Sequence, residues 1–158
     1  MFGETGIRDA VTGLYTRDYF DEVIGRELER ARRHHIALSV VSVVIANRAQ
    51  LLASAGEEAC DVATAQAAKT LQANVRETDS VFRWEEDEFI CLLFEADADA
   101  CARKVHHIAT LFRSWRDGHG PVPHPVKLRI GAATHNRDVV FAGVLQAARA
   151  AARAQTVV

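Results

Sequence analysis

The feature that most restricts the fold is the run IALSVVSVVIA, Ile36 to Ala46, which is largely apolar at both odd and even positions and rich in β-branched residues. A strand with one face in water alternates between apolar and polar residues, so this run predicts a strand that is covered on both faces. Such cover is typical of a sheet with helices packed on each side. An amphipathic helix is predicted just before it, because apolar residues recur at three- and four-residue spacing between Arg17 and His34.

The rest of the chain continues the alternation of helices and strands. We expect a helix at about residues 57–75, a hairpin at 79–95 and a second helix at 97–115. A loop rich in Gly and Pro follows at 116–125, then a strand at 126–134 and an alanine-rich helix at 139–155. This order predicts an α/β fold with helices packed on a mixed central sheet around a βαββαβ core. The 158 residues are the length of one domain, residues 1–158, with a core large enough to need no disulfides.

Charge and cysteine content exclude several classes of protein. The formal net charge is −2, which does not favour nucleic acid or an anionic membrane as the main partner. The longest apolar run, residues 36–46, is too short to cross a bilayer. Cys60, Cys91 and Cys101 lack metal-ligand spacing and are expected to be reduced core thiols of a cytoplasmic protein.

The hairpin VFRWEEDEFICLLF, Val81 to Phe94, carries four consecutive carboxylates, residues 85–88, between its two apolar runs. Tight hairpin turns favour Gly, Asn or Asp, because the turn requires positive φ that other residues adopt at a cost. Two interpretations fit the glutamates at this place. The stretch is either a solvated acidic turn without chemistry or a glycine loop that has changed its residues.

Four segments of the chain resemble the GGDEF domains, whose active members are diguanylate cyclases that condense two GTP into cyclic di-GMP. They are DAVTGLYTRDYF, residues 9–20; ELERARRHHIALSVVSV, residues 27–43; RETDSVFRWEEDEF, residues 76–89; and LRIGAA, residues 128–133. Together they span nearly the whole chain. The resemblance implies the palm-like fold of GGDEF domains and nucleotide cyclases.

The resemblance places the family's catalytic positions on side chains of different chemistry. The two glycines that let the hairpin approach the GTP phosphates fall on Glu85 and Glu86, where positive φ would cost roughly 1 kcal/mol or more per residue. The aspartate pair of the first strand falls on Val44 and Ala46, which leaves Asp87 without its partner. A two-metal phosphoryl-transfer site needs carboxylates from both sides.

The positions that bind guanine and phosphate in the family are also altered. The guanine-reading asparagine falls on Leu52 and the phosphate-binding lysine on Gln155, whereas Asp61 matches the second guanine-reading position. We therefore expect a degenerate domain that is not an enzyme and has no catalytic residue, cofactor or metal. The degenerate former active site comprises Val44, Ala46, Leu52, Asp61, Glu85, Glu86, Asp87 and Glu88.

A second motif is retained. Arg76 and Asp79 form RETD, at the distance from the hairpin where the resemblance implies the inhibitory RxxD site for cyclic di-GMP. An arginine can grip a phosphate or the O6/N7 edge of guanine, and an aspartate can accept from guanine N1–H. The family's second arginine falls on His107, and Arg103 lies one turn earlier on the same helix face. This predicts a receptor for cyclic di-GMP, bound as a stacked pair of molecules.

Alternatives remain open for each motif and for the whole domain. RETD is also compatible with a surface ion pair, and the domain with a nucleotide-free module for protein interaction or dimerisation; residual enzyme activity is the third hypothesis. Arg83 and Asp9 are expected to form a structural salt bridge. The tandem histidines at 34–35 and 106–107 are expected on helix surfaces rather than at a metal. We expect the domain to be excised from a larger signalling protein, with neighbouring domains as partners, a possible homodimer and no direct membrane contact.

Overall fold

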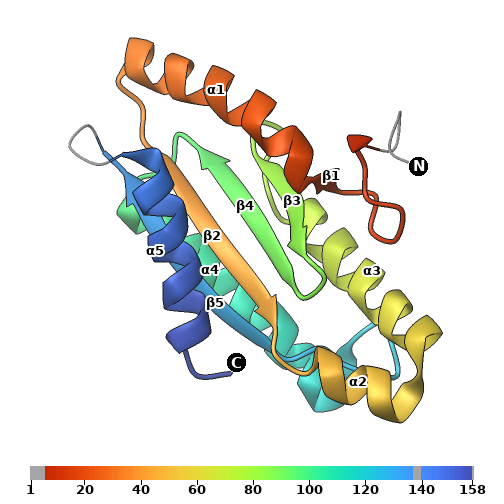
Figure 1. Cartoon of the computed structure of the whole chain (residues 1–158). Helices are drawn as coiled ribbons and strands as arrows, with labels where there is room; N and C mark the ends of the chain where they lie inside the picture. The colour runs from red at the N-terminus through yellow and green to blue at the C-terminus, as the bar shows by residue number, and fades with distance from the viewer. Residues whose placement is uncertain (1–5, 137–139, 158) are drawn as a thin grey trace.

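The computed structural model describes residues 6–136 and 140–157, which form one five-stranded mixed sheet with helices on both faces (Figure 1). The strands are β1 Tyr15–Thr16, β2 Leu38–Ile45, β3 Ser80–Glu85, β4 Glu88–Phe94 and β5 Leu128–His135. The helices are α1 Arg17–His34, α2 Arg48–Ala55, α3 Glu57–Ala73, α4 Ala98–Ser114 and α5 Phe141–Ala154. The strand order is β1-β3-β4-β2-β5, with β2 antiparallel to both of its neighbours. The predicted fold class and its βαββαβ core are confirmed.

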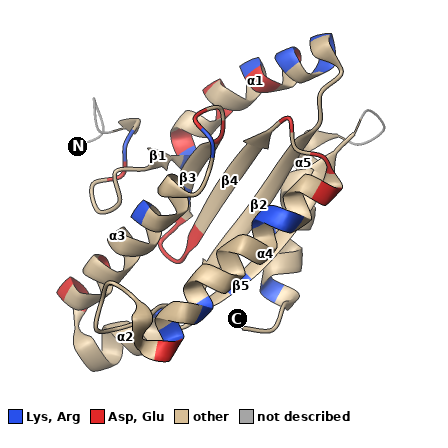
Figure 2. Cartoon of the chain, turned by 180° about the vertical axis from the view of Figure 1, so that it is seen from behind, with Lys and Arg blue, Asp and Glu red and all other residues tan. Residues whose placement is uncertain are grey.

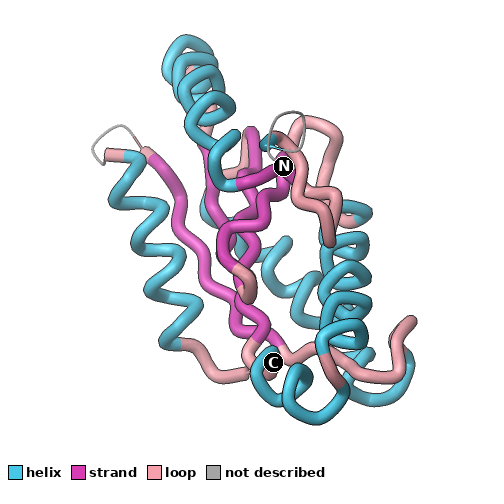
Figure 3. Tube along the Cα trace, turned by 45° about the vertical axis from the view of Figure 1, so that its right-hand side comes forward, coloured by secondary structure: helices cyan, strands magenta, loops and turns pink. Residues whose placement is uncertain are grey.

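Strand β2, which lies between β4 and β5, is buried along its whole length, as its sequence predicted. On one face of the strand, side chains at even-numbered positions such as Val40 pack in a cluster with residues of α1 and α5. On the opposite face, side chains at odd-numbered positions such as Val41 and Val43 pack in a larger cluster with residues of α3 and α4. Figure 3 shows the strands between α5 on one side and α3 on the other. Both faces of the strand therefore need apolar residues.

Local signals set the ends of the longer helices. The Thr16 side chain accepts from the backbone N–H of Tyr19 at the start of α1, and Asp97 accepts from Ala100 at the start of α4. α1 ends where His35 adopts the left-handed conformation with φ 54° and donates its N–H to the carbonyl of Ala31. The bounds predicted for α1 agree with those observed.

A glycine controls how closely the alanine-rich helix approaches the sheet. A Cβ placed on Gly131 of β5 would lie 2.5 Å from the carbonyl oxygen of Ala148 and 2.7 Å from the carbonyl carbon of Ala151. Any side chain at this position would therefore force α5 away from β5. The alanines Ala148 and Ala152 are fully buried at the same contact, which explains the small residues of this helix.

Three elements differ from the prediction. α2 and the two-residue strand β1 were not predicted, and one irregular turn, Trp115–His119, continues α4 into the loop. α2 buries only Leu51 among its eight residues, so its sequence carries little helical periodicity. β1 is recognisable only through its pairing with β3. The predicted start of the last helix at about residue 139 lies outside the described residues.

Among the helices that the structure describes, none combines the length and hydropathy needed to span a membrane.

Candidate functional site

The most concentrated group of charges lies at the tip of the β3–β4 hairpin. The turn is formed by Glu86 and Asp87, and a bulge between Arg83 and Glu85 lets Glu85 pair with Glu88. Among described residues other than glycine, positive φ occurs only at His35 and Glu95. The strain expected at Glu85 and Glu86 is therefore wrong, because the bulge supplies the local twist that a positive-φ turn would otherwise provide.

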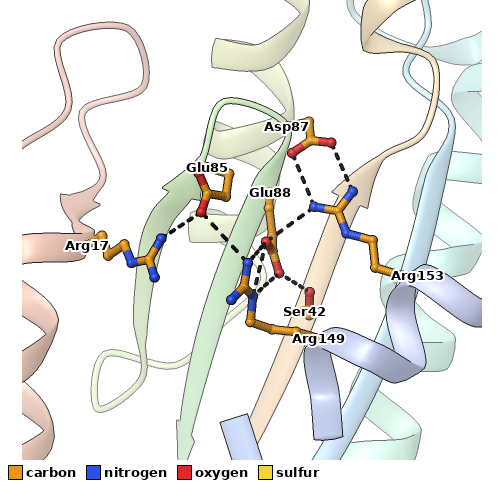
Figure 4. Close-up of polar contacts among 7 residues, drawn as sticks. All are labelled: Arg17, Ser42, Glu85, Asp87, Glu88, Arg149 and Arg153. Atoms are coloured by element: carbon orange, nitrogen blue, oxygen red, sulfur yellow. Dashed lines mark hydrogen bonds and ion pairs between the residues drawn. The ribbon is translucent and has the colours of Figure 1, made fainter. Parts of the chain in front are cut away.

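Glu88 is the centre of this group and is completely buried (Figure 4). Arg149 of α5 donates from Nε and Nη2 to its carboxylate at 2.9 to 3.2 Å. Ser42 of β2 donates its hydroxyl to Oε2 at 2.8 Å. Arg153, one turn later on α5, lies 3.4 Å from Oε1. A buried carboxylate needs this number of donors, because desolvation would otherwise favour its neutral form.

The other three carboxylates are also paired with arginines. Arg153 contacts Asp87 at 3.1 Å, Arg17 contacts Glu85 at 2.6 Å and Arg48 contacts Glu86 at 3.4 Å. Figure 4 shows Arg17 and Arg149 approaching Glu85 from opposite sides. The hairpin tip is therefore tied to α1, α2 and α5. The interpretation as a solvated acidic turn is wrong for Glu88, which is completely buried, whereas Glu85 and Glu86 are exposed to solvent.

These contacts also raise the pKa of two of the arginines. The pKa of the Arg149 guanidinium is raised mainly by its hydrogen bonds to Glu88, and that of Arg153 mainly by its hydrogen bond to Asp87. The raised pKa values favour the charged form of both arginines.

The residues near the tip do not fit the metal ions that the resemblance implies. Val44 lies between Glu88 and Arg129 in the register of the sheet and offers no ligand, and Ala46 offers none either. The donors of Arg149 and Arg153 already occupy the Glu88 and Asp87 carboxylates. In the described part of the chain no group of three or more His, Cys, Asp or Glu side chains is placed to hold a metal.

The structure separates the two positions where the family reads guanine. Asp61 lines a pocket of about 560 Å³ between the N-terminal loop and the start of α3, together with Val11 and Glu57. Leu52 of α2 is 40% exposed and does not belong to the lining of this pocket. Asp61 is therefore half-buried on α3, at the wall of this pocket.

The RETD motif forms a closed turn around Asp79. Its Oδ1 accepts from the backbone N–H of Phe94, and its Oδ2 accepts from the backbone N–H of Arg76, both at 2.9 Å. The Arg76 side chain contacts both carboxylate oxygens at 3.4 Å and donates from Nη2 to the carbonyl of Phe94. The Asp79 side chain is 1% exposed and that of Arg76 is 53% exposed. Asp79 therefore holds Arg76, and only the arginine faces solvent.

Helix α4 lies next to this turn and is joined to it through Asn74, the residue after α3. His107 Nε2 lies 3.1 Å from Asn74 Oδ1, and Lys104 donates to the Asn74 carbonyl at 2.5 Å. Arg103 is exposed one turn before His107 and has no partner among the described residues. Figure 2 shows basic positions on α4. Sequence reasoning missed Lys104 and Asn74, although Lys104 lies three residues before His107 and so shares its helix face.

Three further expectations are confirmed. Arg83 pairs with Asp9 at 3.2 Å. Burial raises the pKa of Asp9, but the hydrogen bonds from Thr12 and the charge of Arg83 outweigh it, so the pKa lies below its usual 3.8. All three cysteines are buried and free, and His34, His35, His106 and His107 are at exposed positions.

Known proteins with a similar sequence belong to one family. The family model described as "Diguanylate cyclase, GGDEF domain" matches residues 7–155. Diguanylate cyclase DosC of Escherichia coli K12 is 29% identical over 100 residues, which cover 63% of this chain and 22% of the relative. The chain thus matches about a fifth of the length of this curated relative.

Solved structures of the family have the same fold. Diguanylate cyclase SiaD of Pseudomonas aeruginosa superposes with a TM-score of 0.83 and 23% identity, over 95% of this chain and 58% of that one. The GGDEF domain of DgcB from Caulobacter crescentus, solved in complex with c-di-GMP, superposes with a TM-score of 0.83 and 18% identity, over 94% of this chain and 88% of that one. The FimX GGDEF domain of P. aeruginosa superposes with a TM-score of 0.82 and 18% identity, over 93% of this chain and 91% of that one.

These matches correct one prediction from the sequence. The chain was expected not to be an enzyme, but the matching family is one of diguanylate cyclases and the curated relatives are named as such. The prediction weighed substitutions at Val44, Ala46, Glu85 and Glu86 above the agreement along the whole domain. Because the family model covers most of the chain, the protein belongs to the diguanylate cyclase GGDEF family.

Proposed function

We propose that this domain binds cyclic di-GMP on the surface formed by Arg76, Arg103, Lys104 and His107, called here the Arg76 surface. The observation that carries the proposal is the state of Arg76. Its Nε and Nη2 are held by Asp79 and by the Phe94 carbonyl, whereas its Nη1 makes no hydrogen bond among the described residues. A fixed guanidinium with one free nitrogen, Nη1, and about half of its side chain exposed suits a phosphate oxygen or a guanine acceptor as its ligand.

The fixed position of Arg76 lowers the entropy that binding must remove. A free arginine side chain loses rotamer freedom when it is immobilised, at roughly 0.5–1.5 kcal/mol per side chain. Asp79 has already fixed Arg76 in the unbound domain. In this proposal Asp79 acts by positioning Arg76, which replaces the role in guanine reading that the sequence suggested for it.

The charge of the ligand suits the rest of the Arg76 surface. Cyclic di-GMP carries two phosphate charges and two guanines, and α4 places Arg103, Lys104 and His107 beside the turn. Arg103 is free to contact phosphate, while Lys104 and His107 keep α4 at this distance through Asn74. The complex of the DgcB GGDEF domain with c-di-GMP supports the choice of ligand. A stacked pair of molecules would double the number of phosphates near these cations.

Calorimetric titration of cyclic di-GMP into the domain tests the proposal. The preparation is first analysed by chromatography for bound nucleotide, since a member of a cyclase family can carry its own product. Arg76→Ala should cost about 1.5–3 kcal/mol for a lost charge-assisted hydrogen bond, which is roughly a ten- to hundredfold loss of affinity. Arg113→Ala is the matched control, because Arg113 is exposed further along α4 and has no described partner.

A double-mutant cycle isolates the role of Asp79. Asp79→Asn should weaken binding in the wild-type background and should have no further effect in the Arg76→Ala background. An independent effect of Asp79→Asn would show that the carboxylate itself contacts the ligand. If cyclic di-GMP gives no heat at high micromolar concentration in a ligand-free preparation, the proposal fails and the interaction module remains as the explanation.

A further inference from the structure

A second cavity, which adjoins the Asp61 pocket at Ala65, lies between the N-terminal loop and the middle of α3. It measures about 780 Å³ and takes its walls from Arg8 and residues 12–15, from one face of α3 and from the segment that leads into β3. These three segments are far apart in the sequence and meet because β1 pairs with β3. The Arg76 surface does not use this cavity, and neither do the arginines of the hairpin tip.

Two cations that have no carboxylate partner in the described part of the chain line this cavity. Arg8 lies over the ring of Tyr15 at 4.0 Å and donates to the Gly13 carbonyl at 3.2 Å. Lys69 of α3 is exposed and makes no hydrogen bond or ion pair among the residues described. Cations whose charge is not balanced within the protein attract an anion from solution.

The acidic groups of the cavity do not cancel this charge. Asp79 reaches its wall, but both carboxylate oxygens are bonded to backbone N–H groups and to Arg76. Glu77 is exposed and in no described ion pair, so one free carboxylate stands against two free cations. Among the described residues that line the cavity the free charge is therefore positive, in a domain whose net charge is −2.

The α3 wall adds hydrogen-bond donors on both sides of the lysine. Gln66, Lys69 and Gln72 follow each other at three-residue spacing and all line the cavity, so they form one row along the helix. The two side-chain amides make no hydrogen bond among the described contacts. A row of amide, ammonium and amide groups opposite a guanidinium matches an extended anion with oxygens at both ends.

We propose that this cavity binds the diphosphate group of a small molecule, with Arg8 and Lys69 holding it from opposite walls. A diphosphate carries at least two negative charges at neutral pH and presents them along its length, as the two cations require. The cavity is larger than this group alone and has room for an attached nucleoside. This inference does not depend on the Arg76 surface, because it rests on different residues.

The test is an NMR titration of the ¹⁵N-labelled domain with inorganic pyrophosphate in buffer without divalent metals. Amide shifts are expected in residues 8–15 and 65–73, and they should weaken as salt is added. Lys69→Ala should raise the dissociation constant by about tenfold or more, because a charge-assisted contact is lost. The same variant should leave the melting temperature unchanged, since Lys69 has no described partner to lose.

Controls distinguish the site and the source of the ligand. Lys127→Ala removes an exposed lysine outside this cavity and should not change the affinity. A second titration uses ADP: equal affinity assigns free diphosphate as the ligand, and tighter binding assigns a nucleoside diphosphate, with Gln66 and Gln72 in contact with the nucleoside. The proposal is overturned if pyrophosphate shifts amides elsewhere only, gives no shifts at millimolar concentration, or binds Lys69→Ala as well as wild type.

Discussion

Removing Arg149 should destabilise the domain far more than removing Arg153, although both arginines lie on α5 and both contact hairpin carboxylates. Glu88 is completely buried. The three shortest nitrogen-to-oxygen contacts of its carboxylate are all made by Arg149. Breaking a buried ion pair by removing one partner costs about 3–5 kcal/mol, because the remaining charge is left without its counterion. Ser42 and Arg153 still reach Glu88, so we expect the lower end, about 3 kcal/mol.

Arg153→Ala provides the matched control. Its side chain is 47% exposed and its main partner, Asp87, is 31% exposed, so the pair is screened by water. Pairs of this kind contribute about 0–1 kcal/mol. For a domain of this size, 1 kcal/mol corresponds to roughly 2–4 °C in melting temperature. Arg149→Ala should therefore lower the melting temperature by about 6–12 °C, and Arg153→Ala by about 4 °C or less.

Urea unfolding followed by circular dichroism measures both variants, and an unchanged dependence on urea shows that the unfolded state is comparable. Combining Arg149→Ala with Glu88→Gln should cost less than the sum of the single changes, because the second change removes the charge that the first left unpaired. Equal destabilisation by Arg149→Ala and Arg153→Ala, or additive effects in the double variant, would refute the reasoning from burial.

Three further changes follow from the geometry. Gly131→Ala should destabilise the domain by about 1–3 kcal/mol or more in the same unfolding assay, because the added methyl group overlaps the backbone of α5. Burial raises the pKa of Asp9, but Thr12 and Arg83 lower it by more, so that the folded pKa lies below the ordinary value of 3.8. The ionised Asp9 therefore stabilises the folded domain above pH 3.8, and this contribution is lost as the pH falls through the folded pKa. Wild type should therefore lose more unfolding free energy than Asp9→Asn between about pH 5 and pH 2; equal losses would contradict this. Burial raises the pKa of Cys91 to about 12, so a thiol reagent at pH 8 should leave it unmodified until urea is added; modification of the folded domain would show that it opens.

The elements that could be predicted from the sequence are those with a strong local pattern. The spacing of apolar residues located α1, and the absence of alternation in residues 36–46 showed that β2 is covered on both faces. The pattern could not reveal α2, which buries one residue, or β1, which exists through its contact with β3. Elements that depend on a partner far along the chain have no local signal.

The candidate site shows the same division. RETD was recognisable as a motif, but the hydrogen bond from Phe94 that occupies Asp79 depends on the pairing of β3 with β4. The pairing of Glu88 with Arg149 depends on how α5 crosses the sheet. The turn at Glu86 was misjudged because a bulge, which the sequence does not encode locally, determines its backbone. The prediction that the chain is not an enzyme was wrong because it interpreted single positions without the agreement along the whole domain.

The placement of β2 between β4 and β5 sets the order in which a nascent chain can become stable. Val41 pairs with Cys91 on one side and with Ala132 on the other, and both partners are synthesised long after it. Its two faces also wait for helices, one of which, α5, is the last element. Pairings of such long sequence separation slow folding, because the loop must close before any contact compensates for its entropy. On the ribosome the most apolar strand of the domain should therefore remain unpaired until β4 has emerged, which makes residues 38–45 a natural binding site for chaperones.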